Sequence, residues 1–345
     1  MNAARGSLRT RRPGGRLLAG AGVPGVLISA SRDPDAKLTF VTTDRRQPGS
    51  ERLAVKVPVT DAAGAAVDRE GRMLVDVRRL GLGALAATLP RYVDSLSVDG
   101  RPVLVSTAVP GVPMSIGYHR WAHTSRPAPV QADFAAALDW LTRFQAATGR
   151  ADAPQDWPTL VAETLRGRWD GHRALAPALE RVEAAGRAMA GSRVLTTAVH
   201  GDFWFGNLLT LDGSVSGVVD WEHAQLRGSP LPDAVRFVLS YGLYLDRHTR
   251  PGHRVLGHPR LVRTGFAPGV TYTLCGAGWF PELARQALAQ HLQQAGVDPG
   301  LWYDAALVGI GEVAGGANDD AFGAGHLELL ASLPLRARRH RRGAR

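Results

Sequence analysis

Two acidic side chains and one carboxamide follow one another at short spacing, in a pattern suited to phosphate chemistry. Residues 200–207 read His-Gly-Asp-Phe-Trp-Phe-Gly-Asn and include Asp202 and Asn207, and Asp220 follows 13 residues later. In phosphoryl transfer one carboxylate orients the attacking hydroxyl and accepts its proton, and magnesium prefers oxygen ligands. We therefore predict that Asp202 is the catalytic base, and that Asn207 and Asp220 bind Mg2+ beside a nucleoside triphosphate.

Short apolar runs beside these residues predict strands that position them. Ala198-Val199 precedes the first segment, and the run 215–219 leads into Asp220. The alternative is an ordinary turn at His-Gly-Asp and a buried strand that ends in a surface acid. The length of the first segment, the gap to Asp220 and the flanking apolar runs together favour the functional interpretation.

A lysine within a predicted strand offers a second part of such a site. The chain has 41 basic residues, and only Lys37 and Lys56 are lysines. Lys56 lies in the run Ala-Val-Lys-Val, where the use of lysine indicates a need for a compact ammonium that a forked guanidinium would not meet. The alternative is a solvated lysine on an edge strand. Lys37 either touches a phosphate or only begins a strand. Asparagine is also scarce, and one of three, Asn207, falls where a metal-binding carboxamide is expected.

The two segments resemble the catalytic loop and the metal-binding strand of the protein-kinase-like fold. The Gly after His200 and the Asp-Trp-Glu at 220–222 resemble the aminoglycoside phosphotransferase and choline kinase-like family. The resemblance implies a bilobal α+β fold, and it implies that the protein uses ATP and Mg2+. It also implies that Lys56 contacts the nucleotide phosphates and pairs with an acid on the following helix. Glu70 is the best match for that acid, and Asp68 is the alternative.

Further residues have supporting roles in this interpretation. His200 would hydrogen-bond within its loop, Asp233 would brace that loop, and Gly206 would permit a tight turn. Glu222 helps to bind a second metal, lines the substrate entrance or is an ordinary surface acid. The loop 31–36, which should cover the phosphates, contains no glycine, unlike the corresponding loop of protein kinases.

The order of elements predicts two lobes. Residues 25–108 form a small β-rich lobe with one helix, which binds the nucleotide, and residues 109–335 form a larger, mainly helical lobe for catalysis and substrate. Residues 250–269 are rich in Gly, Pro, Arg and His and predict a loop. The expected elements are strands at 25–30, 37–43, 53–58, 91–98 and 102–107 and helices at 68–80, 133–148 and 157–190.

Most of the excess positive charge lies at the two ends of the chain. The formal net charge is +10, but five arginines fall in the first 16 residues and six in the last ten, and the rest has 30 basic and 31 acidic residues. We predict disordered basic tails at 1–24 and 336–345 and no specific nucleic-acid partner. No apolar run approaches the roughly 18 residues of a membrane helix. Cys275 is the only cysteine, which excludes an internal disulfide and suits a cytoplasmic protein.

Together these features predict a small-molecule O-kinase that transfers the γ-phosphate of ATP to a hydroxyl of a metabolite, sugar or antibiotic. A polycationic aminoglycoside should require an acid-rich pocket, yet residues 223–334 contain nine acids and eight arginines and give it no clear support. The alternative is a catalytically weak or inactive nucleotide-binding protein of the same fold. The sequence leaves the acceptor, the choice between ATP and GTP and the oligomeric state open.

Overall fold

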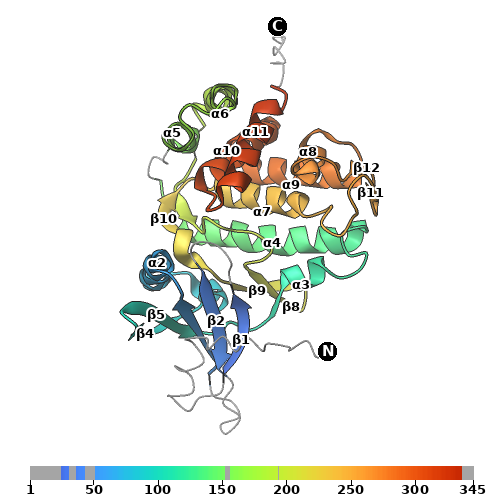
Figure 1. Cartoon of the computed structure of the whole chain (residues 1–345). Coiled ribbons are helices and arrows are strands. Elements are labelled where there is room, and N and C mark those ends of the chain that lie inside the picture. Colours follow the sequence, from blue (N-terminus) through green and yellow to red (C-terminus); the bar gives the residue numbers. More distant parts are fainter. Residues whose placement is uncertain (1–24, 31–35, 43–50, 152–155, 193, 336–345) are drawn as a thin grey trace, which may run out of the picture.

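The computed structural model has two lobes, and the long helix α4 (Pro127–Thr148) belongs to the larger one, where it lies between most of the other helices and the smaller lobe (Figure 1). The smaller is built on a β-sheet, and the larger is mainly helical. The predicted tails 1–24 and 336–345 and most of the predicted loop 31–36 lie outside the described residues. The structure describes residues 25–30, 36–42, 51–151, 156–192 and 194–335.

Five antiparallel strands form the sheet of the small lobe, in the order β1-β2-β3-β5-β4. Val55 and Val57 of the central strand face one side of the sheet, where they join a small apolar core. Lys56 between them faces the other side, because side chains alternate along a strand. The strands are β1 (Gly25–Ala30), β2 (Lys37–Thr42), β3 (Leu53–Pro58), β4 (Tyr92–Val98) and β5 (Arg101–Thr107).

The turn between β4 and β5 confirms the predicted hairpin. Asp99 and Gly100 both have positive φ, 52° and 76°. Two successive residues of this kind are typical of the tight turns that match the twist of paired strands.

Helix α2 (Asp61–Arg78) covers the face of the sheet to which Lys56 points. It begins well before the predicted start at residue 68, because the Thr60 side chain accepts a hydrogen bond from the amide of Ala63 (3.1 Å) and caps the helix. The small residues that follow Thr60 gave no apolar spacing from which this first part could be recognised. Glu70 lies on the buried face of α2, together with Val67 and Leu74.

The larger lobe packs around helix α10 (Trp302–Gly316), which is apolar on most sides and contacts α5, α6, α7 and α11. The predicted helix 133–148 lies within α4, and the predicted helical region 157–190 consists of two helices. The other helices are α3 (Met114–Tyr118), α5 (Trp157–Arg168), α6 (Leu175–Met189), α7 (Leu231–Leu243), α8 (Pro268–Cys275), α9 (Trp279–Gln294) and α11 (Asp320–Ser332), with short 3-10 turns η1 (Gly83–Thr88), η2 (Trp221–His223) and η3 (Pro299–Leu301).

Short strands interrupt the helices where the two predicted motif segments lie. Strand β7 precedes residue 200 and pairs with β10, while β8 and β9 lie between Asn207 and Asp220 and form a three-stranded sheet with β6. The apolar runs beside the motifs therefore form strands as predicted. These strands are β6 (Val112–Pro113), β7 (Thr197–Val199), β8 (Leu208–Leu211), β9 (Ser214–Val218) and β10 (Gln225–Gly228).

The prediction of a loop at 250–269 is wrong in part, because this segment contains the hairpin β11 (Arg254–Val255) and β12 (His258–Val262) and the start of α8. Tertiary contacts hold the hairpin. The buried His258 ring hydrogen-bonds the Thr124 carbonyl (2.8 Å), and Gly257 lies against the backbone of Ser125. Across the described ranges, no helix is both long and apolar enough to cross a membrane. The lobe boundary at 108/109 stays a prediction.

Candidate active site

The segment 200–207, called the 200–207 loop below, is held by a buried carboxylate and a buried imidazole. Asp233, in the first turn of α7, accepts hydrogen bonds from the amides of His200 (2.7 Å) and Gly201 (2.9 Å). Nε2 of His200 lies 3.0 Å from the Val219 carbonyl, and its Nδ1 accepts from the Asp202 amide (3.2 Å). This pattern requires one protonated and one unprotonated nitrogen, so the ring is neutral, and burial lowers the pKa of His200. Both residues support the loop as predicted.

Main-chain contacts fix the 200–207 loop against the segment that carries Asp220. The Val219 amide donates to the Asn207 carbonyl (3.0 Å). Gly201 has φ +81°, and a Cβ at this position would lie 2.9 Å from the carbonyl carbon of His223 and closer still to its oxygen. Only glycine combines this left-handed conformation with so close an approach. Asp202 and Asp220 therefore come from segments that touch through their backbones.

Gly206 has a different role from the predicted one. Its φ is not positive, so the turn itself does not require glycine. Instead, a Cβ at Gly206 would lie 2.7 Å from Cε2 of Trp204 and closer to other atoms of that ring. Glycine is needed here because the indole of Trp204 packs directly on the backbone before Asn207.

Two partners orient the carboxylate of Asp202. Arg236 of α7 binds Oδ1 through Nε (3.1 Å) and Nη2 (2.6 Å), and Asn207 donates from Nδ2 to Oδ2 (2.9 Å). Burial lowers the pKa of Arg236, but the Asp202 charge outweighs this effect, so the pKa is raised overall and the guanidinium stays charged. Asp202 borders a cavity of about 200 Å³. A carboxylate so placed can accept a proton from a hydroxyl in that cavity.

Lys56 lies between two carboxylates from different lobes. Its ammonium donates to Glu70 Oε1 (2.7 Å) and Oε2 (2.6 Å) and to Asp220 Oδ1 (2.8 Å). The alternative partner, Asp68, instead binds Arg72 on the outer surface of α2 (3.0 Å). Burial lowers the pKa of Lys56, but Asp220 and then Glu70 raise it further, so the pKa is above its ordinary value. The structure thus resolves the Lys56 pairing in favour of Glu70.

Asp220 lies at a sharp change of chain direction. Strand β9 ends at Val218, and Asp220 has left-handed backbone angles (φ 72°, ψ 61°) before η2 begins. Such a conformation is uncommon outside glycine, although aspartate tolerates it better than most residues. Residues two apart on a strand point to the same side, but the strand does not continue through Asp220. The relative positions of Asp220 and Glu222 are therefore set by this turn.

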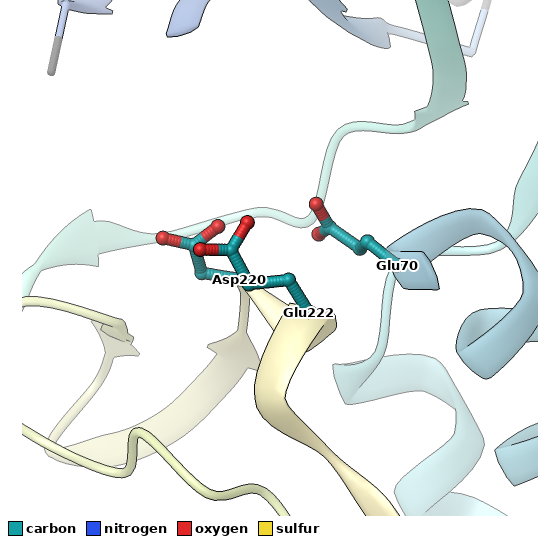
Figure 2. A group of neighbouring side chains, drawn as sticks. All are labelled: Glu70, Asp220 and Glu222. Carbon is teal, nitrogen blue, oxygen red and sulfur yellow. The ribbon is translucent and has the colours of Figure 1, made fainter. Parts of the chain in front are cut away.

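Glu222 is not an ordinary surface acid, because its side chain is only 10% exposed and it pairs with Lys37 at the start of β2. Figure 2 shows that Glu70, Asp220 and Glu222 turn their carboxylates toward one another. One oxygen of each lies within 4.8 Å of the others. Burial would raise the pKa of Asp220, but Lys56 and Lys37 lower it well below its ordinary value, so it is anionic.

The residues fit a magnesium ion by the chemistry of their donors. Asp220 offers an anionic oxygen, the donor type that magnesium prefers. Asn207 directs both of its amide hydrogen bonds to Asp202, at the carbonyl and at Oδ2, each 2.9 Å. Within the part of the chain that the structure describes, nothing donates to Asn207 Oδ1. The predicted metal ligands therefore leave a neutral and a charged oxygen available, and their assignment stays a prediction.

Arg236 is a site residue that the sequence interpretation missed. It lies three residues after Asp233 on α7, and residues at this spacing share a helix face. Because Asp233 was expected to brace the 200–207 loop, its neighbour on the same face could have been expected to reach that loop as well. The contact of Arg236 with Asp202 follows this rule.

Two solved structures share the arrangement of a small β-rich lobe and a larger helical lobe. Aminoglycoside phosphotransferase APH(4)-Ia, solved as a thermostable mutant, is 16% identical, has a TM-score of 0.54, and aligns over 91% of this chain and 97% of that one. Macrolide 2'-phosphotransferase MphH from Brachybacterium faecium is 14% identical, has a TM-score of 0.51, and aligns over 93% and 98%. This likeness shows the protein-kinase-like bilobal α+β fold that was predicted.

The sequence profile of the phosphotransferase enzyme family matches residues 35–251, more than half of the chain. The chain belongs to this family, which confirms the predicted resemblance. A homoserine kinase from Gluconacetobacter diazotrophicus is 31% identical over 133 residues, which is 37% of this chain and 39% of that protein. The chain therefore aligns with well under half the length of this relative. APH(4)-Ia has also been solved with ADP or AMP-PNP together with hygromycin B.

Proposed function

We propose that the protein is an ATP-dependent kinase that transfers the γ-phosphate to a hydroxyl of a small molecule. One observation carries the proposal: the 200–207 loop links a carboxylate at a cavity, Asp202, to an ion-pair cluster between the lobes, Lys56 with Glu70 and Asp220. The first can receive a proton, and the second can neutralise phosphate charge. The acid-base group and the charged groups thus have separate positions in one connected site.

The ion-pair cluster supports a nucleotide site in the cleft between the lobes. Lys56 and Lys37 supply two ammonium groups from adjacent strands, and both reach carboxylates of the larger lobe. Ammonium groups are common phosphate ligands. We assign Lys56 to the nucleotide phosphates, with Glu70 holding its ammonium in position.

The larger lobe supports the hydroxyl-activating half of the reaction. Arg236 and Asn207 fix both oxygens of Asp202 and leave lone pairs that can accept the hydroxyl proton as the new bond to phosphorus forms. Magnesium, when bound, neutralises charge on the phosphate oxygens. Asn207 and Asp220 are the residues that we assign to it.

The acceptor class follows from the family and from Asp202. A homoserine kinase, an aminoglycoside phosphotransferase and a macrolide phosphotransferase are among the similar proteins, and their names refer to small molecules of different kinds. We propose a small hydroxyl compound as the partner and the cytoplasm as the place of action, since the chain has a single cysteine. We further propose residues 25–108 as the nucleotide-binding lobe and 109–335 as the catalytic lobe.

The test is the substitution Asp202→Asn, which keeps the shape of the side chain and removes its basicity. ADP release should be measured across aminoglycosides, macrolides, choline-like amines, sugars and homoserine. For any accepted compound, kcat should fall by roughly 10²–10⁴-fold, while nucleotide affinity should change little. The matched control is Asp212→Asn in the exposed turn between β8 and β9, which should keep full activity. Wild-type turnover by Asp202→Asn would contradict the assigned role.

A catalytically inactive nucleotide-binding protein of the same fold is the second candidate. The presence of Lys56, Glu70, Asp202, Asn207 and Asp220 together argues against it. Thermal stabilisation by ATP that depends on Mg2+, without phosphate transfer to any acceptor, would favour this alternative.

A further inference from the structure

The cavity beside Asp202 is lined mainly by apolar side chains and opens to solvent on one side. It lies among the 200–207 loop, α7, α8, α10 and α11, and its volume is about 200 Å³. An engineered apolar cavity of about 150 Å³ accommodates benzene, so this one has room for about one substituted ring. Its apolar wall includes Trp204, Leu239, Leu243, Val270, Ile310 and Phe322.

The charges at this cavity compensate one another. Among the described residues that line it, Asp202 is the only acid, and its partner Arg236 is the only Lys or Arg. The other carboxylates near Arg236 are engaged elsewhere. Asp233 accepts two backbone amides, and Glu312 lines a separate cavity on the other side of α10. At the described lining of the cavity, a cationic ligand would therefore meet one carboxylate, and that carboxylate is already paired with Arg236.

His326 gives the cavity a neutral polar group. The side chain is buried, and its Nδ1 lies 2.9 Å from the Phe322 carbonyl, so Nδ1 carries the proton and Nε2 is an acceptor. Burial lowers the pKa of His326 to about 4, so the ring is neutral at physiological pH. Within the described part of the chain, no group donates to Nε2. A hydroxyl of a ligand would satisfy this acceptor.

We propose that the cavity binds the acceptor substrate and selects an uncharged alcohol with a mainly apolar body of about one ring, and that it excludes cationic amines. This inference rests on the proposed function, since Asp202 marks the cavity as the acceptor side. Burying an ammonium beside the Arg236 guanidinium without a free carboxylate is unfavourable. Apolar rings, in contrast, match the side chains of the wall.

The experiment compares two probes of nearly equal size, cyclohexane-1,4-dimethanol and its cationic counterpart 4-(aminomethyl)cyclohexanemethanol. Binding is measured by calorimetry on the full chain with AMP-PNP and Mg2+. The neutral probe should bind at least about tenfold more tightly, a difference of about 1.4 kcal/mol. Val313→Asp, at a half-buried position of the wall, should reverse the preference. Leu211→Asp, on the exposed end of β8, is the control and should leave it unchanged.

Equal or tighter binding of the cationic probe to the wild-type protein would overturn the proposal, and so would the absence of binding by the neutral probe at millimolar concentration. These outcomes do not depend on whether Val313→Asp folds. Phosphate transfer is measured separately on the same probes. Tight binding of the neutral probe without transfer to any alcohol would contradict the proposed function and leave the selectivity intact. Transfer to the cationic probe alone would contradict the selectivity and leave the proposed function intact.

Discussion

We expect Lys56→Met to destabilise the protein by about 3–5 kcal/mol near neutral pH, because it removes one partner of a buried ion pair. The Lys56 side chain is 12% exposed and that of Glu70 is 2% exposed. Methionine preserves most of the aliphatic stem, so little packing is lost. The carboxylates of Glu70 and Asp220 would then face each other without the ammonium that lies 2.6–2.8 Å from both.

The pH dependence of this loss has a definite sign. In the wild-type protein, Lys56 and Lys37 hold the pKa of Asp220 well below its ordinary value against the effect of burial. Without Lys56, burial raises that pKa, and the folded variant takes up a proton more readily than its unfolded chain does. Relative to the wild-type protein, the variant should therefore gain stability as pH falls. The difference in unfolding free energy should be largest at about pH 8 and smaller at about pH 5.

The assay is urea unfolding of both proteins at the two pH values. Arg101→Met is the matched control, because Arg101 forms an exposed pair with Asp61 (2.8 Å), and such pairs contribute roughly 0–1 kcal/mol. A loss for Lys56→Met no larger than that of the control, or one that grows toward acid, would refute the argument that the cluster is desolvated.

Two further predictions concern the larger lobe. Gly201→Ala should lower kcat by about 10²-fold, because its Cβ would overlap the His223 carbonyl. Gly213→Ala is the control, since Gly213 has a similar positive φ and open space around it. Equal kinetic effects of the two substitutions would contradict the close-approach argument. His326→Gln tests a buried neutral imidazole. Because its pKa is lowered from 6.5 to about 4, its contribution is complete above pH 6.5 and is lost as pH falls. The wild-type protein should lose about 2 kcal/mol more than the variant by about pH 5 in urea unfolding, and parallel acid curves would exclude this contribution.

Much of the small lobe could be predicted from sequence because its signals are local. Alternating apolar residues and the Asp99–Gly100 turn define strands within a few residues of their observed ends. The start of α2 could not be predicted in the same way, since it depends on the Thr60 cap and on alanines that carry no apolar periodicity. The β11–β12 hairpin was missed because contacts of His258 with a distant segment, not local composition, hold it.

The same difference between local sequence signals and tertiary contacts applies to the residues of the candidate site. Asp202, Asn207 and Asp220 could be named as candidates because the spacing of the motif is itself informative, and Lys56 because lysine is rare in this chain. Arg236 and His326 do not stand out in the sequence, because arginine and histidine are common in this chain. Only the three-residue spacing from Asp233 on α7 pointed to the place of Arg236. The position of His326 at the Asp202 cavity results from the packing of α11, which no short-range pattern encodes.

The ion pairs between the lobes place nucleotide binding and lobe association in competition. Lys37 and Lys56 of the small lobe are bound to Glu222 and Asp220 of the larger lobe. A phosphate that enters the cleft must compete with these carboxylates for the two ammonium groups. The free energy of breaking the ion pairs between the lobes therefore reduces the measured affinity for the phosphate. Such linkage is reciprocal. A change that weakens these interlobe ion pairs, and leaves the ammonium–phosphate contacts unaffected, should therefore strengthen nucleotide binding.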